Sequence, residues 1–350
     1  MTPKILAIRL RALGDVVLVT PALRALQRGH PGASIDVVTD PRYAGILSWV
    51  PEVSRVWPLE RSTFSAWRLG ARLRRERWEW ALDFFGNPRS ALVARLSGAR
   101  LRAGFDLRGR RHAYDVRVPR DAPGPRGGRE HASAAHVRLA VAAGGVADGD
   151  PAALTPPSGA LARGRDLLAA AGVRAPARAI GLVAAGTWST KTWPVASAAV
   201  LARLLTDAAR EVLVIAGPGE DAVTATLTRH APAVRALPPC DVEGLAGAIA
   251  HLEAVVGTDS GPRHLAAALG VPTFAWFGPT HPETWQPPGA SHAFWRASIP
   301  CAGCDRTRCP HWICMPMLAP AEAARLVLEH LDRVESLRDS AAAFGPAAGA

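Results

Sequence analysis

Residues 254–270 read AVVGTDSGPRHLAAALG and hold the most informative pattern in this chain of 350 residues. The apolar run Ala254–Gly257 predicts a buried strand, and the small and polar residues after it predict a turn. Pro262 suits the first turn of a helix, and Gly270 suits its end. A strand, a turn and a helix in this order form the repeating unit of a parallel α/β layer. The segment therefore predicts an α/β fold.

The turn in this segment also predicts an anion-binding site. The backbone N–H groups of Ser260 and Gly261 lie at the start of the expected helix, where they are free and the helix dipole is positive. His264 is placed to donate to the same anion, although a core histidine bonded to backbone explains it equally well. We expect a diphosphate to bind here, with simple helix capping as the alternative.

The same rhythm recurs along the chain and predicts two similar α/β halves. Further strands are expected at Lys4–Leu10, Ser34–Thr39, Trp80–Phe84, Ala179–Ala184, Glu211–Ala216 and Thr273–Phe277. Helices are expected through Pro21–Gln27, starting at Gly14 or Thr20, and over Pro320–Leu337. The Pro-, Gly- and Asp-rich segment 148–159 predicts a linker. We therefore expect domains over residues 1–155 and 156–338, with a disordered Ala/Gly-rich tail at 339–350.

Composition favours a soluble, cytoplasmic, globular protein. Hydrophobic residues make up 49% and charged residues 20%, which excludes a disordered chain. Apolar runs stay below the ~18 residues of a membrane span. Charges interrupt the apolar N-terminal stretch, so it does not resemble a signal peptide. Five cysteines, four of them close together near the C-terminus, do not form the framework of a secreted protein.

Arginine supplies nearly all of the positive charge. The chain has 41 Lys and Arg residues against 30 Asp and Glu, a formal net charge of +11, and its only lysines are Lys4 and Lys191. A solvated Arg-rich surface explains most of this excess, and attraction to an anionic partner is the alternative. Nucleic acid is not expected, because no recognised nucleic-acid-reading motif accompanies the charge. Phosphorylated lipids and nucleotides remain as anionic partners.

Residues 9–17, RLRALGDVV, place a carboxylate directly after the first strand. Asp15 is expected at the carboxyl edge of the sheet, where open α/β folds bind ligands. There it can accept a proton from a substrate hydroxyl, or it can simply cap the following helix. A GxGxxG dinucleotide fingerprint is absent, which disfavours a dehydrogenase.

Residues 186–194, GTWSTKTWP, follow another expected strand. Glycine with neighbouring hydroxyls makes a loop that can approach phosphate oxygens closely. Lys191 places a compact cation in this loop, in a chain that otherwise uses arginine. The alternative is a chance surface lysine at a helix start. The segment is not a P-loop, because it lacks the Gly-x4-Gly-Lys spacing.

Residues 301–314, CAGCDRTRCPHWIC, gather most of the cysteines. The side chains that could bind a metal are Cys301, Cys304, Cys309 and Cys314, with His311 among them. Such thiols can form a tetrahedral structural zinc site, and reduced thiols on a structured loop are the alternative. The Asp148-Gly149-Asp150 sequence resembles a metal-binding DxD motif, but its place in the linker argues against that role.

Taken together, these motifs resemble the heptosyltransferase family, glycosyltransferase family 9, of lipopolysaccharide assembly. The resemblance covers most of the chain. It rests on LGDVV at 13–17 with TPALR at 20–24, on KTWP at 191–194, on DSGP at 259–262 with HLAAALG at 264–270, and on FGPT at 277–280 with the Cys-rich segment. Arg11 and Arg263 stand where family members often carry smaller or apolar residues.

The resemblance implies a GT-B architecture, in which two Rossmann-like, doubly wound domains face a central cleft. It implies an inverting transfer of heptose from ADP-heptose to a lipid A–Kdo type acceptor of the lipopolysaccharide inner core. The acceptor would bind the N-terminal domain and the nucleotide sugar the C-terminal domain. Catalysis would require no cofactor, since a lysine and a helix N-terminus can stabilise the leaving group.

Carried over to this chain, the resemblance assigns a role to each matching residue. Asp15 would be the general base, and Arg9 and Arg11 would bind the acceptor. Donor binding would fall to Thr187, Ser189, Lys191, Glu220, Asp259, Ser260, Gly261 and His264, with Lys191 neutralising the leaving diphosphate and Glu220 bonding the ribose. Because a carboxylate repels phosphate, we expect Asp259 to contact the sugar or to orient Lys191 or His264.

Two alternatives stay open from the sequence. The same fold can use another nucleotide sugar, such as a hexose or N-acetylhexosamine donor, for envelope glycan assembly. The chain can also be a non-catalytic nucleotide-binding module, although the presence of both Asp15 and Lys191 argues against that. In the favoured hypothesis the protein acts at the cytoplasmic face of the inner membrane, in peripheral contact with a lipid-linked phosphorylated saccharide.

Overall fold

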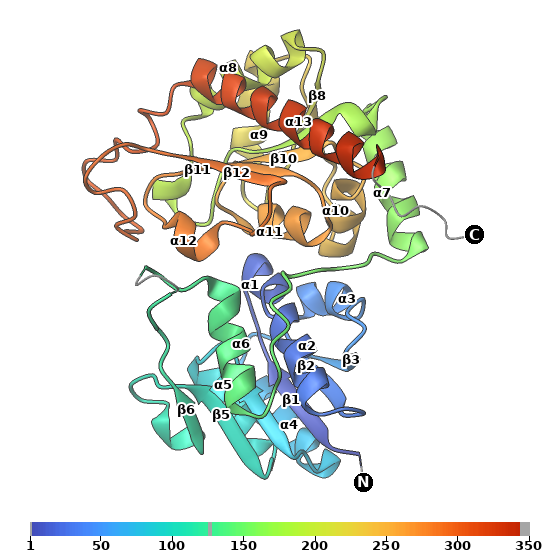
Figure 1. The fold of residues 1–350 in the computed structure, drawn as a ribbon, viewed down its shortest axis with the longest axis vertical. Coiled ribbons are helices and arrows are strands. Elements are labelled where there is room, and N and C mark those ends of the chain that lie inside the picture. Colours follow the sequence, from blue (N-terminus) through green and yellow to red (C-terminus); the bar gives the residue numbers. More distant parts are fainter. Residues whose placement is uncertain (1, 125–127, 344–350) are drawn as a thin grey trace. The chain divides into compact units, whose positions relative to one another are not determined.

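The computed structural model describes residues 2–124 and 128–343 (Figure 1). The chain divides into two compact units, which are described separately below. The first comprises Met1–Ser158 and Cys240–Ala246, and the second comprises Gly159–Pro239 and Gly247–Ala350. Residues 240–246, which the sequence assigned to the second domain, therefore pack with the first unit.

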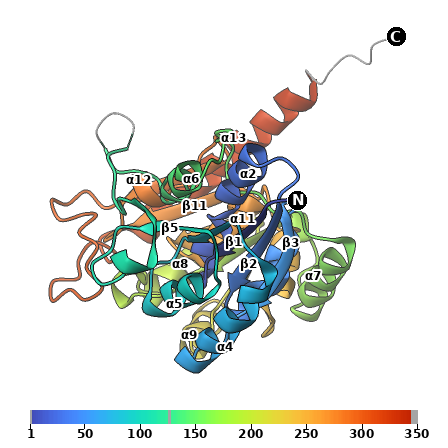
Figure 2. The ribbon, with the colours of Figure 1, turned by 90° about the horizontal axis from the view of Figure 1, so that it is seen from below.

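The first unit is built on a six-stranded parallel sheet of order β3-β2-β1-β4-β5-β6. Its strands are β1 Lys4–Ile8, β2 Ser34–Thr39, β3 Val53–Pro58, β4 Trp80–Asp83, β5 Leu101–Phe105 and β6 Val116–Val118. Its helices are α1 Leu13–Val17, α2 Thr20–Gly29, α3 Ala44–Leu47, α4 Thr63–Leu73, α5 Pro88–Leu96 and α6 Ala132–Ala142. Helices α2 and α6 pack together, as do α4 and α5 (Figure 2). The strand order reverses between β1 and β4, and ligands bind at such a point in open α/β sheets.

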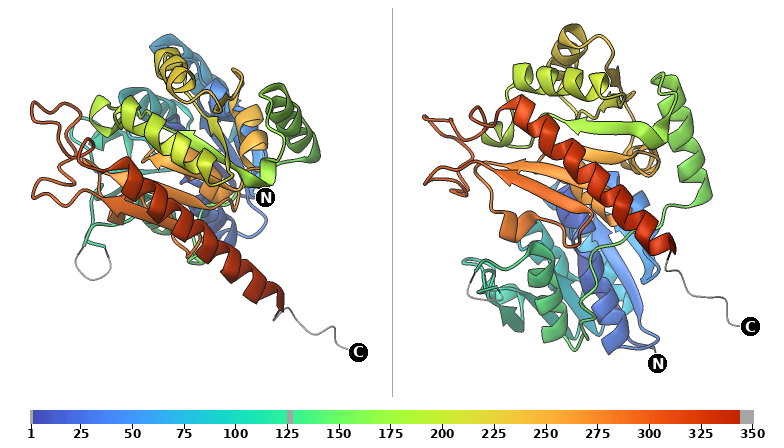
Figure 3. Two further views of the ribbon diagram at one scale, coloured as in Figure 1. Left: turned by 90° about the horizontal axis from the view of Figure 1, so that it is seen from above. Right: turned by 45° about the horizontal axis from the view of Figure 1, so that its top comes forward.

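The second unit repeats this design with a sheet of order β12-β11-β10-β7-β8-β9, also parallel throughout. Its strands are β7 Ala179–Val183, β8 Glu211–Val214, β9 Arg235–Ala236, β10 Ala254–Thr258, β11 Thr273–Phe277 and β12 His292–Arg296. Its helices are α7 Ser158–Ala170, α8 Val195–Asp207, α9 Asp221–His230, α11 Gly261–Ala268, α12 Pro282–Trp285 and α13 Pro320–Ala343, and α10 Val242–Ile249 joins the segment shared with the first unit. Helices α8 and α13 lie side by side (Figure 3).

Both sheets confirm the α/β, doubly wound fold class. The strands expected from the sequence are all present, but β3, β5, β6, β9 and β12 were missed. These strands lie at or next to the sheet edges, where exposed or half-buried arginines interrupt the apolar pattern. The last helix was expected to end at Leu337 and continues to Ala343. Residues 344–350 of the expected tail lie outside the described residues.

Gly257 permits a close approach between the two central strands of the second sheet. It pairs with Val183 of β7, and its φ of +149° lies in a region that favours glycine. A Cβ at this position would lie 2.1 Å from the Val183 carbonyl oxygen, which belongs to rigid backbone. The turn that follows β10 can therefore start at the switch point only if this residue has no side chain.

We expect Gly257→Ala to lower the free energy of unfolding by about 1–3 kcal/mol, because strand β7 must move and the backbone is strained. Urea unfolding followed by circular dichroism measures the change. Gly159→Ala is the matched control, because a Cβ there meets open space, and it should shift stability by less than about 0.5 kcal/mol. Equal stability of the Gly257→Ala protein and the natural chain would contradict this account.

Candidate active site

Asp15 lies at the carboxyl end of the first sheet, on the short helix α1 that directly follows β1. The sequence predicted a turn at Leu13–Asp15, and the structure has a helix over Leu13–Val17. The Asp15 Oδ2 atom accepts a hydrogen bond from the backbone N–H of Ala12 at 3.3 Å and so satisfies the N-cap residue of the helix. Its side chain keeps 26% of its surface exposed. Asp15 therefore caps the helix and still presents carboxylate surface to solvent.

The buried side chain of Arg9 forms an ion pair with this carboxylate. Its Nη2 atom lies 2.6 Å from Asp15 Oδ1, and only 2% of the arginine side chain is exposed. Its Nη1 atom donates to the Phe84 carbonyl at 2.5 Å, and the Phe85 ring lies 5.3 Å from the guanidinium carbon. Burial lowers the pKa of Arg9, and the Asp15 charge opposes that shift. The predicted acceptor-binding pair is thus divided, since Arg9 is buried beneath Asp15 while Arg11 is exposed.

His136 of α6 completes this cluster, and no motif in the sequence marks it. Its Nε2 atom lies 3.5 Å from Arg9 Nη1, and its Nδ1 atom lies 3.1 Å from the Leu18 carbonyl. Burial first, and the Arg9 charge second, lower the pKa of His136 to about 3. The neutral ring donates from Nδ1 to Leu18, which leaves Nε2 as an acceptor toward Arg9. His136 therefore helps to position Arg9, and Arg9 in turn positions the Asp15 carboxylate.

A second carboxylate, Asp83, lies at the same edge but is fully enclosed. It accepts the backbone N–H groups of Phe85 and Gly86 at 3.0 and 2.9 Å, and the Tyr114 hydroxyl at 2.6 Å. Burial raises the pKa of Asp83, and these hydrogen bonds oppose the rise. Its acceptor capacity is occupied by its own loop and by Tyr114, so Asp15 is the better placed of the two to meet a substrate.

In the second unit, Lys191 reaches the carboxylate predicted to orient it. The predicted phosphate loop forms a short 3-10 turn over Ser189–Lys191. Lys191 Nζ lies 2.9 Å from Asp259 Oδ2, with 15% of the lysine side chain exposed, and 5.2 Å from the centre of the Trp188 ring. Thr187 and Ser189 are exposed on the same loop.

Asp259 is the centre of the charged groups at the end of β10. Only 3% of its side chain is exposed, and besides Lys191 it faces Arg263 Nη1 at 3.6 Å and His264 Nε2 at 3.5 Å. Burial alone would raise the pKa of Asp259, but Lys191, His264 and Arg263 hold it well below its usual range. Contacts of Asp259 with Lys191 and His264 agree with one of the two roles expected from the sequence, and contact with the sugar stays a prediction. The Asp259 side chain carries a full negative charge at neutral pH.

The start of α11 offers polar groups that the protein leaves unused. Ser260 is the N-cap residue of this helix, and its side chain makes no capping hydrogen bond. Within the described residues, the buried Ser260 Oγ and His264 Nδ1 atoms have no hydrogen-bond partner. Such groups are costly to bury and often mark a place for a ligand. The residues that converge here are named the anion site below: Lys191, Asp259, Ser260 and His264 with their side chains, and Gly261 with its backbone N–H.

Glu220 does not join the anion site. It follows β8 as the N-cap residue of α9, and its Oε2 atom accepts the Gly217 N–H at 2.7 Å. Its carboxylate closes its own turn at the carboxyl edge of the sheet. The ribose-binding role of Glu220 stays a prediction.

Arg263, which the sequence marked only as unusual, is buried beside the anion site with 1% of its side chain exposed. Its Nη1 atom donates to the Trp285 carbonyl at 3.3 Å, and its Nη2 atom donates to Gln286 Oε1. The Phe277 ring lies 5.2 Å from the guanidinium carbon. Burial lowers the pKa of Arg263 to about 10, against the opposing charge of Asp259, so the group stays positive at neutral pH.

The Cys-rich segment supports the Lys191 loop from outside. Thr190 donates its hydroxyl to the Arg306 carbonyl at 2.8 Å, and Trp312 Nε1 donates to the Thr190 carbonyl at 3.0 Å. The four thiols Cys301, Cys304, Cys309 and Cys314 line one small cavity with His311, and all four are free. Across the described part of the chain, no group of three or more potential ligands is arranged to hold a metal ion. The structural zinc expected at these thiols therefore stays a prediction.

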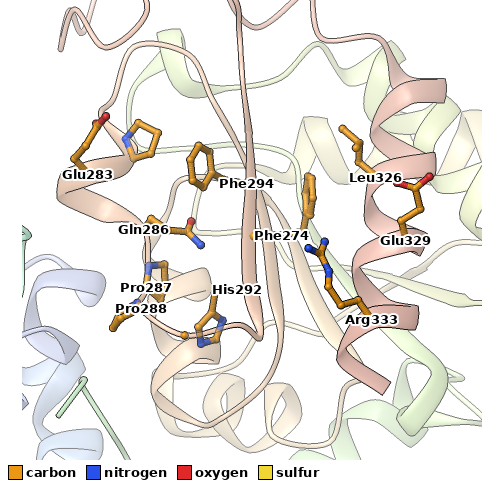
Figure 4. A pocket seen from close by; sticks show the side chains of 13 residues that line it. Phe274, Glu283, Gln286, Pro287, Pro288, His292, Phe294, Leu326, Glu329 and Arg333 are labelled. Carbon is orange, nitrogen blue, oxygen red and sulfur yellow. The ribbon is translucent and has the colours of Figure 1, made fainter. Parts of the chain in front are cut away.

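A larger pocket of about 670 Å³ lies along the edge strand β12, between α12 and α13 (Figure 4). Phe274, Gln286, His292, Phe294 and Arg333 are among its lining residues. None of the residues predicted for the site lines it. One lining residue, Gln286, accepts a hydrogen bond from Arg263, which lies beside the anion site.

Residues 66–312 match the model of glycosyltransferase family 9 (heptosyltransferase). The chain belongs to this family and is a glycosyltransferase. Lipopolysaccharide heptosyltransferase 1 of Pseudomonas aeruginosa is 30% identical over 320 residues, which cover 88% of each protein. Lipopolysaccharide heptosyltransferase 3 of Escherichia coli is 25% identical over 79% of this chain and 84% of that protein.

Solved structures confirm the GT-B heptosyltransferase fold. The E. coli ADP-heptose lipopolysaccharide heptosyltransferase II matches with a TM-score of 0.79 at 22% identity, covering 95% of this chain and 99% of that one. The family 9 glycosyltransferase of Veillonella parvula matches with a TM-score of 0.84 at 17% identity, covering 95% and 98%. In the part of this glycosyltransferase that the structure describes, no helix combines the length and apolarity needed to cross a bilayer.

The low pKa of His136 predicts acid sensitivity. The unfolded chain takes up a proton near pH 6.5 and the folded chain only near pH 3, so stability is full above about pH 6.5 and is lost as the pH falls toward 3. Between pH 7 and pH 5 this one group should account for about 1–2 kcal/mol of lost stability.

The free energies of unfolding of the natural chain and of the His136→Gln variant, measured in urea at pH 7 and at pH 5, give this contribution. The loss between pH 7 and pH 5 should be smaller in the variant. The exposed His230→Gln serves as the matched control and should keep the natural pH dependence. An identical pH dependence in His136→Gln and the natural chain would contradict the buried, neutral histidine.

Proposed function

We propose that this glycosyltransferase moves a heptose from ADP-heptose to the lipopolysaccharide inner core, on an acceptor of the lipid A–Kdo type, with inversion at the anomeric carbon. The observation that carries the proposal is the ion pair of Lys191 and Asp259 at the N-terminus of α11, in a chain 30% identical to a lipopolysaccharide heptosyltransferase. A cation beside free helix N–H groups suits a diphosphate leaving group.

Asp15 is the general base in this proposal. It takes the proton of the acceptor hydroxyl, whose oxygen then forms a bond to the anomeric carbon as the bond to the diphosphate breaks. Arg9 and the Ala12 N–H hold the carboxylate in one orientation, and its exposed surface faces solvent. Arg9 thus orients the base, and the exposed Arg11 is left as the arginine that contacts the acceptor.

The anion site receives the leaving nucleoside diphosphate. Lys191 and the N–H groups of Ser260 and Gly261 offset its charge, His264 donates to it, and Thr187 and Ser189 bind its outer oxygens. Glu220 bonds the ribose hydroxyls. Because these groups carry the charge of the leaving group, no cofactor is needed for the transfer.

The acceptor is a lipid-linked phosphorylated saccharide, reached by peripheral contact at the cytoplasmic face of the inner membrane. The chain has a net charge of +11, and nearly all of its positive charges are arginines. This excess supports attraction to such a headgroup. Structural zinc at Cys301, Cys304, Cys309 and Cys314 stays a separate prediction, which elemental analysis of the purified protein tests.

The sugar is tested by competition. The enzyme is incubated in EDTA with equal amounts of ADP-heptose, ADP-glucose and UDP-N-acetylglucosamine and a lipid A–Kdo acceptor, and the product is weighed by mass spectrometry. The acceptor should gain the mass of one heptose. A gain of a hexose or an N-acetylhexosamine would favour the alternative donor, and an unchanged acceptor would contradict the transfer.

Asp15→Asn should reduce turnover by about 10²–10⁴-fold, because the amide cannot take the acceptor proton. ADP affinity should stay within about twofold, since Asp15 lies in the other unit from the anion site. Steady-state rates with saturating substrates measure the loss. Asp166→Asn on the exposed face of α7 is the matched control and should turn over normally. Normal turnover of Asp15→Asn would remove this residue from the mechanism.

Lys191→Met should weaken ADP binding by about tenfold or more, because a charge-assisted contact to the diphosphate is lost. Titration calorimetry with ADP measures it, and Lys4→Met is the control because Lys4 pairs with Glu76 in the other unit. Unchanged ADP affinity of Lys191→Met would show that this lysine does not meet the phosphates.

A further inference from the structure

The charges of the anion site do not by themselves favour a diphosphate. Lys191 and Asp259 form a close pair, with 2.9 Å between Nζ and Oδ2, and their charges cancel. A nucleoside diphosphate brings further negative charge next to the Asp259 carboxylate. Like charges at such short range destabilise each other, most of all where water is excluded.

Arg263 is the third charged group of this network. It carries a positive charge within 3.6 Å of Asp259 Oδ1, the oxygen that Lys191 does not pair with. With it the network Lys191, Asp259 and Arg263 has a net charge of +1. Without it the net charge is zero.

The surroundings of Arg263 hold the guanidinium toward Asp259 and away from solvent. Its two terminal nitrogens donate hydrogen bonds to the Trp285 carbonyl and to the Gln286 amide oxygen, and the Phe277 ring lies against the group. A planar fork can bond these acceptors and face the carboxylate at the same time, which an ammonium group cannot do. Its Nε atom stays buried without a hydrogen-bond partner among the described residues, so the site bears a cost to keep an arginine here.

We propose that Arg263 is a positioning residue that offsets part of the charge of Asp259, so that the network keeps a net positive charge for the diphosphate of the donor while Lys191 stays paired with Asp259. The inference rests on the proposed function, because it requires a nucleoside diphosphate in the anion site. Arg263 acts through Asp259 and, at 1% exposure, does not itself touch the ligand.

The test is titration calorimetry of the full chain with ADP and with adenosine. Arg263→Met should weaken ADP binding by about tenfold and leave adenosine affinity within about twofold, because only the diphosphate senses the lost charge. Adding Asp259→Asn to Arg263→Met should bring ADP affinity back to within about threefold of the natural chain, since the network regains a net charge of +1. Arg263→Lys keeps the charge and should bind ADP better than Arg263→Met.

Other outcomes would overturn the inference. A purely structural arginine predicts that ADP and adenosine affinities fall together and that the double variant is no better than Arg263→Met. If Arg263→Met does not fold, Asp259→Asn alone decides, because it must bind ADP more tightly than the natural chain, and equal or weaker binding contradicts the charge argument.

Failure of the proposed function is visible separately. No transfer from ADP-heptose, together with the expected ADP affinities of the variants, would contradict the donor sugar and support the role of Arg263. Absence of ADP binding by the natural chain would contradict the anion site and the inference with it.

Discussion

The second unit is organised around one buried anion, the carboxylate of Asp259. An unpaired carboxylate in this environment would cost several kcal/mol, so its partners must be held close. Lys191 comes from the loop after β7, Arg263 and His264 from α11, and Arg263 is anchored in turn by the end of α12. The interactions of the Asp259 carboxylate therefore connect the ends of β7 and β10 with α11 and, through Arg263, with α12. Gly257 allows this, because it lets the two strands lie close enough for the loops above them to meet.

The first unit also pairs a carboxylate with a buried arginine, but its carboxylate is more exposed. In each unit a carboxylate follows a central strand, and a nearly fully buried arginine holds it, Arg9 for Asp15 and Arg263 for Asp259. Asp15 keeps 26% of its side chain exposed and Asp259 only 3%. The exposed carboxylate can meet a hydroxyl and take its proton, whereas the buried one serves as a fixed charge. In the proposed mechanism, two similar sheets therefore supply two different chemical functions.

The sequence predicted the class of the fold and most of the central strands, because buried parallel strands read as short apolar runs. It also led us to expect that Asp259 contacts the sugar or orients Lys191 or His264, because a carboxylate repels phosphate, and the structure brings these three side chains together. The sequence did not predict the other contacts between segments that lie far apart along the chain. Nothing local shows that His136 lies under Arg9, that Gln286 binds Arg263, or that Trp312 bonds the Thr190 carbonyl. The edge strand β12 was missed for the same reason: its own residues show a weak apolar pattern, and the strand forms by pairing with its neighbour β11.

The central claim is that the anion site takes an adenosine diphosphate without the help of a metal. The most direct test is calorimetric titration of the natural chain with ADP, UDP and GDP in the presence of EDTA. The account predicts that ADP binds at least about tenfold more tightly than either of the others. Preference for UDP or GDP, or binding of ADP only after a divalent metal is added, would contradict it.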